Sequence, residues 1–340
     1  MKHIEHLVDR CSDDHTIKQA FQNYKHLFWV NTFLSHLNKA LEKVYQTNKR
    51  AYNDFVQNKI PAVSGASFNK HSLISSLCEI SIMNTFICQS ECPESLLYEP
   101  KLRSDNKKNV EFSIQIKGVK YNIEVKSPNL SNYYSDLESK IEKHGVVTRF
   151  DTRAFGKPEQ VDQMPSPGIR VKDFLVDASL KFPNSNLPKQ VNILFIAWDD
   201  HTDQPCIELQ HPIHGLLTQN SWHKDNDGHP ILFSNINLIF ISDLYQNIIA
   251  HLSSGDIPLP SFLTGVPYFE RNCRFPPNQV NPFFLPYSRN VLVKPTVDLE
   301  DPQIREIIFN IPVAFSDQSV DMIDEEYVAK YGTDIKISFK

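Results

Sequence analysis

The sequence predicts an α/β protein in which helices flank a mixed central sheet, with an N-terminal helical region before this core and a C-terminal extension after it. Three observations predict this class. Residues 109–126 alternate apolar and polar side chains around a Lys-Gly pair, as a β-hairpin does. Nearly continuous apolar runs of strand length follow at 191–198 and 236–241, which is typical of strands covered on both faces. Helical patterns lie before the hairpin and between it and the first run.

The N-terminal helical region is predicted from its spacing. Residues 14–58 carry apolar side chains at helical intervals and contain no glycine or proline, so they are expected to form helix. Asp13 or Asp14 can cap its start. Pro61 and Gly65 then mark a break before the next element.

A second helix is predicted over residues 67–89, and its later half is strongly apolar. Glu79 lies within it and is followed at helical spacing by Ile82, Met83 and Phe86. An unpaired charge in such surroundings would cost several kcal/mol. Glu79 is therefore expected to have a cationic partner or a chemical role.

The register of the hairpin follows from its two faces. With the turn centred on Lys117 and Gly118, apolar residues face apolar residues, and a shift by one position would scramble both faces. This register sets Glu111 opposite Glu124 and places Lys126 on the face of Glu124. The other predicted pairs are Val110 with Val125, Phe112 with Ile123, Ser113 with Asn122, Ile114 with Tyr121, Gln115 with Lys120, and Ile116 with Val119.

Two carboxylates directly opposed on a sheet repel each other. The repulsion between Glu111 and Glu124 would cost from a few tenths to about 1 kcal/mol. A divalent metal ion bridging the two side chains is the simplest explanation for accepting that cost. The hairpin therefore predicts a cation site.

The elements around the hairpin complete the predicted sheet and its cover. A strand is expected at 96–102, and residues 169–182 form an amphipathic helix whose apolar positions Val171, Leu175 and Leu180 face inward. The remaining expected elements are a polar helix at 130–144, a helix at 244–252, a loop or arm at 258–286 and strands at 291–293, 307–311 and 335–339.

Composition limits the class of protein further. Apolar residues make up 41% and charged residues 22%, as in ordinary globular proteins. No apolar run reaches the length of a membrane span and the N-terminus has no signal-peptide pattern, so a cytoplasmic protein without membrane association is expected. The six cysteines are scattered without a C-x-x-C pair, which predicts neither a disulfide framework nor a zinc site. The net charge of −5 divides into +5 over residues 101–190 and −10 elsewhere, so the hairpin lies in the basic third.

These residues resemble the PD-(D/E)xK nuclease superfamily, whose fold is restriction-endonuclease-like. Glu124, Val125 and Lys126 match its E-x-K element, Glu111 lies thirteen positions earlier as the first acidic ligand, and Glu79 matches an accessory acid on the preceding helix. The order helix, strand, hairpin, helix, strand is also similar to that of the family's core.

One departure from the family's pattern concerns the first acid. The family's Pro-Asp appears here as Val110-Glu111, so the proline is absent and the acidic side chain is longer. Asp105 is an alternative ligand. The hairpin register favours Glu111, because only that residue is set opposite Glu124.

The resemblance implies a metal-dependent endonuclease that hydrolyses phosphodiester bonds, in DNA rather than RNA, in a restriction or phage-defence role. It implies Mg2+, for which Mn2+ substitutes, held by Glu111, Glu124 and the backbone carbonyl of Val125. Lys126 would orient the attacking water or stabilise charge in the transition state. Glu79 would hold a metal-bound water or a second ion, unless it forms a salt bridge with a lysine at the edge of the core.

The resemblance also suggests a division of the chain. Residues 63–255 would form the nuclease core, 1–62 the N-terminal helical region, and 256–340 an extension for recognition or dimerisation, because homodimers are common in the family. The alternative is a catalytically inactive nuclease-fold protein that acts as a nucleic-acid-binding or assembly module.

Other charged or histidine-rich positions give weaker signals. Arg170, Lys172 and Lys181 can contact phosphate, but an ordinary solvated helix face is favoured. His211, His214 and His223 lack a matching set of carboxylates and are expected to be loop or surface residues.

Overall fold

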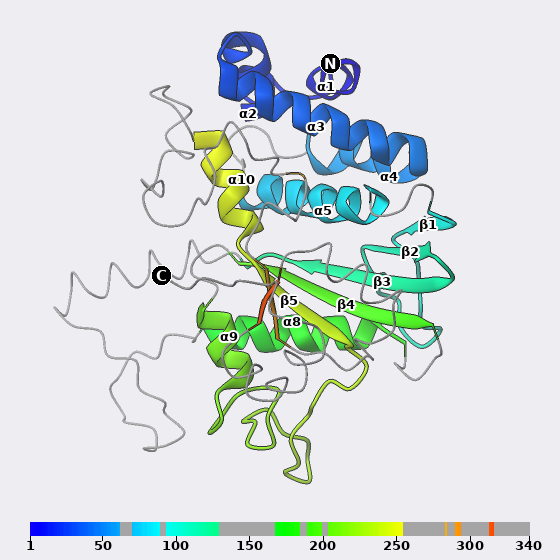
Figure 1. The fold of residues 1–340 in the computed structure, drawn as a ribbon, viewed down its shortest axis with the longest axis vertical. Helices are drawn as coiled ribbons and strands as arrows, with labels where there is room; N and C mark the ends of the chain where they lie inside the picture. Colours follow the sequence, from blue (N-terminus) through cyan, green and yellow to red (C-terminus); the bar gives the residue numbers. More distant parts are fainter. Residues whose placement is uncertain are drawn as a thin grey trace, which may run out of the picture.

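The computed structural model describes residues 1–61, 70–88, 93–128, 167–183, 189–198, 203–253, 283, 290–293 and 313–315. Over this part of the chain the protein is mixed α/β, with a seven-stranded mixed sheet and helices on both of its faces (Figure 1). The predicted coarse fold class is confirmed. No helix in the described part is both long and apolar enough to cross a membrane.

The N-terminal region is a stack of short and long helices above the sheet (Figure 1). The predicted single helix over 14–58 is wrong, because the backbone is extended at Leu27 and again at Asn48. Asn48 restarts the helix by accepting a hydrogen bond from the Ala51 amide. The elements are α1 Lys2–Val8, α2 Thr16–Gln19, η1 Ala20–Tyr24, α3 Phe28–Thr47, α4 Lys49–Asp54 and η2 Phe55–Lys59.

The N-terminus of α2 is capped by a residue that the sequence did not suggest. The N-cap of α2 is His15, whose Nδ1 accepts a hydrogen bond from the Ile17 amide at 3.2 Å. Asp13 and Asp14 lie two and one positions too early to serve as the N-cap, and Asp13 pairs with Lys18 instead. The predicted aspartate cap is therefore wrong.

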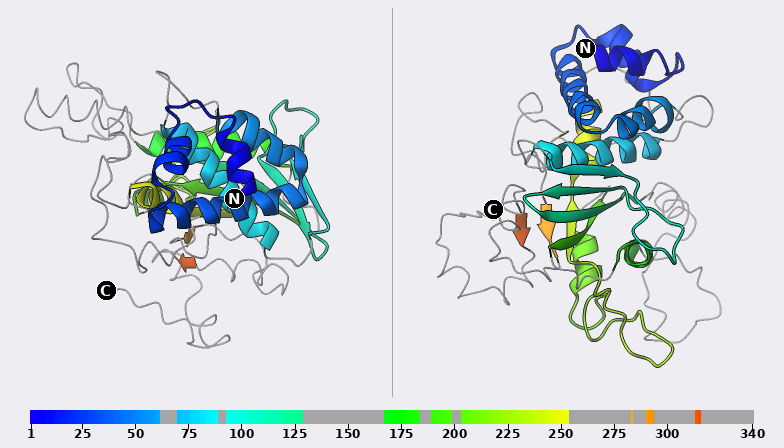
Figure 2. Two further views of the ribbon diagram at one scale, coloured as in Figure 1. Left: turned by 90° about the horizontal axis from the view of Figure 1, so that it is seen from above. Right: turned by 90° about the vertical axis from the view of Figure 1, so that its right-hand side faces the viewer.

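Two layers of helix enclose the sheet (Figures 1 and 2). α5 (Lys70–Cys88) and α10 (Leu244–Ser253) lie between the sheet and the N-terminal helices, and α8 (Pro167–Lys181) and α9 (Asp203–Gln210) lie on the opposite face. α5, α8 and α10 agree with the predicted helices to within a few residues. α1 and α9 were not predicted.

The strands of the sheet lie side by side in the order of the chain. The first three are antiparallel, the fourth and fifth continue parallel to the third, and the last two form a parallel pair antiparallel to the fifth. The strands are β1 Ser95–Tyr98, β2 Phe112–Ile116, β3 Val119–Lys126, β4 Gln190–Ala197, β5 Leu238–Ser242, β6 Asn290–Leu292 and β7 Val313–Phe315.

The order predicted for the core is found in α5, β1, the β2–β3 hairpin, α8 and β4. β1 is shorter than its predicted strand, because Glu99 has a φ of 47° directly after Tyr98. β7 lies outside the predicted strands. The predicted elements at 130–144, 307–311 and 335–339, and the arm at 258–286 apart from Phe283, lie outside the described residues.

The hairpin has the predicted register along its ladder. Phe112 lies opposite Ile123 and Ile116 opposite Val119, and the three pairs between them also match. Lys117 and Gly118 form the turn with φ values of 50° and 75°, the left-handed conformation that suits glycine at the second position.

The predicted pairing fails beyond the ladder, at its open end. Val110 packs in the hydrophobic cluster on the α8 side of the sheet, whereas Val125 belongs to the cluster on the α5 side. The strand begins only at Phe112, so the alternation that fixes the ladder does not extend to Val110. The predicted Val110–Val125 pair is therefore wrong. The predicted Glu111–Glu124 pair is absent from the ladder as well, because Glu111 contacts Lys59 together with Glu79 of α5, whereas Glu124 contacts Lys181 of α8.

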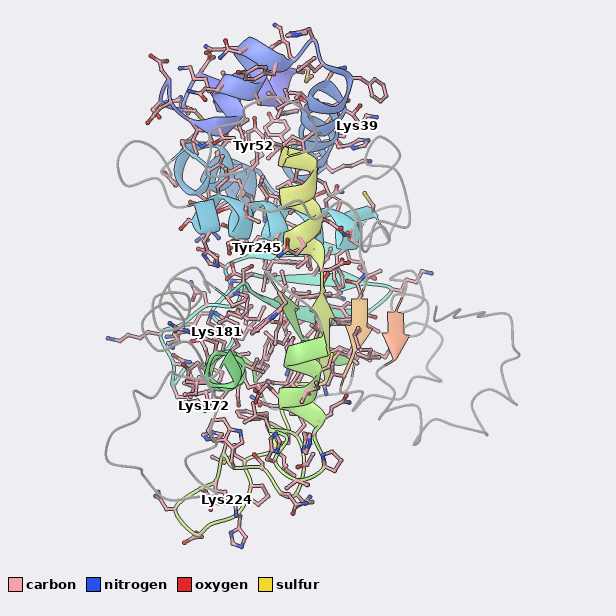
Figure 3. All side chains as sticks on the ribbon, turned by 90° about the vertical axis from the view of Figure 1, so that its left-hand side faces the viewer. Lys39, Tyr52, Lys172, Lys181, Lys224 and Tyr245 are labelled. Atoms are coloured by element: carbon pink, nitrogen blue, oxygen red, sulfur yellow. The ribbon has the colours of Figure 1, made fainter. Side chains whose placement is uncertain are left out.

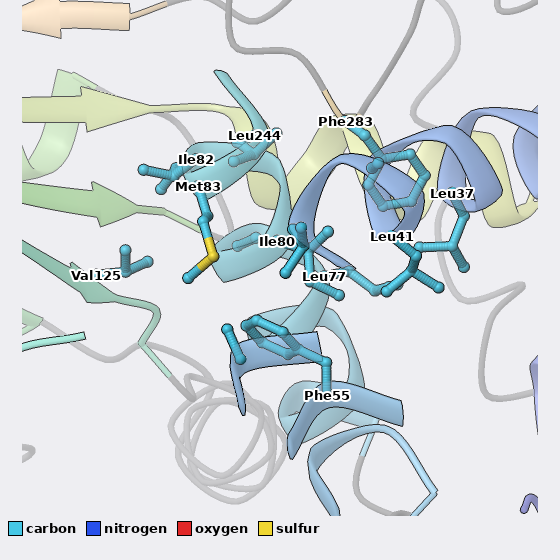
Figure 4. Packing of buried hydrophobic residues seen from close by; sticks show 14 of the residues in the cluster. Leu37, Leu41, Phe55, Leu77, Ile80, Ile82, Met83, Val125, Leu244 and Phe283 are labelled. Atoms are coloured by element: carbon cyan, nitrogen blue, oxygen red, sulfur yellow. The ribbon is translucent and has the colours of Figure 1, made fainter. Parts of the chain in front are cut away.

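Two hydrophobic clusters hold the layers together. One joins the N-terminal helices, α5 and α10 to the upper face of the sheet, where Met83 of α5 lies near Val125 of β3 (Figure 4). The other joins the lower face to α8 and α9. β4 is buried on both faces as predicted, since residues 191–197 are all buried.

The buried face of α8 differs from the predicted one at its end. Val171 and Leu175 are buried as predicted, but Leu180 is 47% exposed. Ala178 and Phe182 complete the stripe instead, because positions three, four and seven residues apart share one face of a helix. This corrected face brings Lys181 toward the sheet.

Candidate acid and lysine site

Glu124 and Lys126 lie on the same face of β3, as predicted. The Lys126 Nζ is 2.7 Å from Glu124 Oε1. Glu124 is fully buried and the Lys126 side chain is 19% exposed. The E-x-K element is therefore one close ion pair at the carboxyl end of β3.

A second lysine reaches the same carboxylate oxygen from α8. The Lys181 Nζ lies 2.5 Å from Glu124 Oε1, and Figure 3 shows Lys181 on the sheet side of α8 with Lys172 on the side away from the sheet. The solvated-face prediction is thus wrong for Lys181. Arg170 is exposed, and Lys172 pairs with Asp173 at 2.8 Å, so neither joins this cluster.

Asp177 links the lysines to one another. Its carboxylate lies 2.7 Å from Lys126, 3.3 Å from Lys181 and 2.5 Å from Lys108. The sequence analysis missed Asp177, although Asp177 and Lys181 have the i, i+4 spacing of a helical ion pair. Lys126 is consequently fixed between two carboxylates.

One oxygen of Glu124 has no partner. Both lysine ammonium groups contact Oε1, whereas Oε2 is buried without a hydrogen-bond partner among the described residues. Buried carboxylate oxygens are normally hydrogen-bonded, because removing a charged oxygen from water without compensation is costly. This oxygen is suited to a ligand that supplies positive charge.

The other two predicted acids surround a lysine that the sequence analysis did not consider. The Lys59 Nζ lies 2.7 Å from Glu79 Oε2, 3.5 Å from Glu111 Oε2 and 3.4 Å from Glu99 Oε1. Of the two roles open to Glu79, the salt bridge with a lysine at the edge of the core is the one that this geometry displays. No local pattern around Lys59 or Glu99 distinguished them, since 20 to 52 positions separate Lys59 from Glu79 and Glu111.

The negative charge of one acid affects the pKa of the others. Burial raises the pKa of Glu79, repulsion from Glu111 raises it further, and Lys59 lowers it in part. Burial also raises the pKa of Glu124, where Lys126 and Lys181 oppose the shift and Glu111 adds to it. The charge of Glu111 thus opposes ionisation of both Glu79 and Glu124.

Lys126 keeps its proton in this environment. Burial by itself would lower the pKa of Lys126, but Glu124 and Asp177 together raise it above its ordinary value. An ammonium group of this kind donates hydrogen bonds and stabilises negative charge. It cannot serve as a general base at neutral pH.

The predicted ligands do not form a closed cage around a common point. Glu124 is neutralised by Lys126 and Lys181, and Glu79 and Glu111 by Lys59. Among the described residues, the group of three with ligand atoms within 4.8 Å of one another is Asp225, Asp227 and His229, all exposed on a turn.

The remaining predicted positions are placed as follows. Val125 lies within β3 in register with Phe195 of β4, and its carbonyl as a metal ligand stays a prediction. Asp105 forms an exposed pair with Arg103 and does not join the acids around Lys59. His211 and His214 stack on each other with ring centroids 3.9 Å apart.

No family model, no curated protein and no solved structure matches this chain.

Proposed function

We propose that the protein is a metal-dependent endonuclease with a restriction-endonuclease-like core, which hydrolyses phosphodiester bonds in DNA. The observation that carries this proposal is the buried Oε2 of Glu124, which has no hydrogen-bond partner among the described residues, on a carboxylate whose Oε1 contacts the ammonium of Lys126 on the same strand. A carboxylate oxygen without a donor among the described residues can bind a metal ion, and a protonated lysine beside it can stabilise negative charge in the transition state of phosphodiester hydrolysis.

The arrangement of elements supports the proposal. Glu111 directly precedes β2, Glu124 lies on the neighbouring strand β3, and Glu79 of the preceding helix α5 lies with Glu111 around Lys59. This is the order of helix, strand, hairpin, helix and strand that the family resemblance implied.

The roles of the residues follow from their charges. A bound Mg2+ supplies a Lewis acid and lowers the pKa of a coordinated water. Glu124 through Oε2, Glu111 and the carbonyl of Val125 would hold the ion. Lys126, fixed by Glu124 and Asp177, places an ammonium where charge develops on the phosphoryl oxygens. Water adds to phosphorus and releases a proton to solvent, the bond to the leaving ester oxygen breaks, and that oxygen takes up a proton from solvent.

Several broader assignments belong to the same proposal. DNA as the substrate, a restriction or phage-defence role, cytoplasmic location and a homodimer all derive from the family resemblance. The residues of the site bear only on the chemistry, which is why the tests address chemistry first.

A second candidate is supported by a different observation. The lysines around Glu79, Glu111 and Glu124 already compensate most of the negative charge of these acids. Such a network fits a nuclease-fold protein that binds nucleic acid or a partner protein without cutting. It differs from the first candidate in predicting no metal-dependent turnover.

The discriminating experiment is a cleavage assay on supercoiled plasmid DNA with Mg2+ or Mn2+. We predict that wild type converts the plasmid to nicked or linear forms and that EDTA abolishes this. Glu124→Gln and Lys126→Met are each predicted to lower the rate by about 100-fold or more, the scale seen when one electrostatic stabiliser is removed from an active site.

Lys120→Met is the matched control, because Lys120 lies on the same strand opposite Gln115 and away from the cluster. It should cut at the wild-type rate. Cleavage that is equal in wild type and both site variants contradicts the assignment of Glu124 and Lys126. Plasmid binding without any nicking favours the second candidate.

A further inference from the structure

Lys59 is held in place by more than its ion pairs. Its Nζ lies 5.3 Å from the centre of the Phe55 ring and 5.4 Å from that of Tyr98, close enough for cation–π attraction. The Tyr98 hydroxyl donates a hydrogen bond to Asp54 at 2.7 Å, which fixes one of these rings. The Lys59 side chain is only 22% exposed. Lys59 therefore occupies a defined position and is not a loose surface lysine.

The same ammonium occupies the space between carboxylates from three separate elements. Glu79 comes from α5, Glu99 follows β1 and Glu111 precedes β2, while Lys59 itself ends η2 of the N-terminal helical region. Without Lys59, these carboxylates would face one another uncompensated. A cation is required at this point for the fold to tolerate them.

A divalent ion bound by Glu79 or Glu111 would compete with the Lys59 ammonium for the negative charge of these carboxylates. An ion at Glu111 would also repel the nearby ammonium, because the Lys59 Nζ lies 3.5 Å from Glu111 Oε2. Binding of a metal ion at Glu111 must therefore overcome this repulsion or displace the Lys59 ammonium.

We propose that Lys59 is a resident counter-ion that competes with the divalent metal for Glu79 and Glu111, so that the N-terminal helical region sets the metal affinity of the site. This inference rests on the metal site of the proposed function. It assigns to Lys59 a positioning role, since Lys59 acts through the acids and not on the substrate.

The test is calorimetric titration of Mn2+ into the full-length chain, with Lys59→Met, Lys59→Arg and a control. Lys59→Met keeps an apolar stem of similar length and removes the charge, and it is predicted to bind Mn2+ about tenfold more tightly or better. Lys59→Arg keeps the charge, and its guanidinium can donate hydrogen bonds to two carboxylates. This variant is therefore predicted to bind Mn2+ no more tightly than wild type.

Two further variants locate the effect. Lys18→Met removes a lysine whose ion pair in the described structure is with Asp13 and not with these acids, and it should leave the Mn2+ affinity unchanged. Adding Glu111→Gln to Lys59→Met should abolish the gain in affinity, because the gain is assigned to the oxygens that Lys59 releases.

The outcomes separate this inference from the proposed function. If wild type binds Mn2+ and Lys59→Met binds it equally or more weakly, the counter-ion role is wrong while the nuclease proposal stands. If neither wild type nor Lys59→Met binds Mn2+, the metal site itself is contradicted. Should Lys59→Met fail to fold even with Mn2+ present, tighter binding by Lys59→Arg than by wild type overturns the inference.

Discussion

Glu124 is fully buried, with one carboxylate oxygen contacted by two ammonium groups and the other by none in the described part of the chain. A side chain that served only to neutralise Lys126 and Lys181 would be expected to share both oxygens between them. The concentration of both lysines on Oε1 leaves Oε2 as an acceptor without a donor, at a cost in stability. A bound cation would remove that cost, which is the physical basis of the proposed site.

Asp177 offers a test of how Lys126 is held. Asp177→Asn removes the charge that Lys108, Lys126 and Lys181 share, and it is predicted to lower the free energy of unfolding by about 1–3 kcal/mol. The nuclease proposal adds that plasmid cleavage falls as well, because Lys126 loses one of its two anchors. Urea denaturation measures the first effect and the plasmid assay measures the second.

Asp173→Asn provides the comparison on the same helix. Asp173 is about half exposed and pairs only with Lys172 in the described structure, so its replacement should change stability by less than about 0.5 kcal/mol. If Asp177→Asn and Asp173→Asn lower the free energy of unfolding equally, the ion pairs of Asp177 with the three lysines do not stabilise the fold more than an exposed pair does.

At the scale of single elements, α2 depends on a neutral histidine. His15 is fully buried, its Nδ1 accepts from the Ile17 amide, and its Nε2 lies 3.1 Å from the Ile60 carbonyl oxygen. An imidazole that accepts at one nitrogen and donates at the other is in its neutral form. Burial lowers the pKa of His15, and the hydrogen bond to Ile60 opposes this shift in part.

The sign of the resulting pH dependence follows from this lowered pKa. Below about pH 6.5 the unfolded chain binds a proton at His15 that the folded chain does not bind, so stability falls as the pH falls. Above that pH the contribution is fully present. His15→Gln is predicted to reduce the loss of stability between pH 7.5 and 5.5, as measured by urea denaturation.

His229→Gln is the control for this effect, because His229 has a side chain that is 77% exposed. Its pH profile should run parallel to that of wild type. Other histidines with lowered pKa values contribute to the slope of every variant, so the quantity to compare is the difference between wild type and His15→Gln. If stability depends on pH in the same way in wild type and His15→Gln, His15 is not the neutral cap of α2 described above.

At the scale of the whole molecule, the sequence predicted what depends on local periodicity. The ladder from Phe112 to Ile123 could be predicted because a period of two has one register that buries the apolar side chains. β4 was predictable because a short, continuous apolar run fits a strand covered on both faces.

Features that depend on distant residues escaped prediction. The break at Asn48 has no glycine or proline to signal it, and the strand alternation gave no sign that Val110 leaves the hairpin. Lys59 and Lys181 lie 52 and 57 positions from their partners Glu111 and Glu124, so only the packing of helices on the sheet brings them together. Glu79, Glu111, Glu124 and Lys126 were therefore predictable, whereas Asp177, Glu99 and the other lysines of the site were not.

The most direct test of the metal site is anomalous diffraction from crystals soaked in Mn2+. We predict a peak bound by Glu124 Oε2 and the carboxylate of Glu111, at about 2.0–2.3 Å from the ligand oxygens, with Lys59 moved away from Glu111. A peak at Asp225, Asp227 and His229 alone, or no peak beside Glu124, would contradict the account.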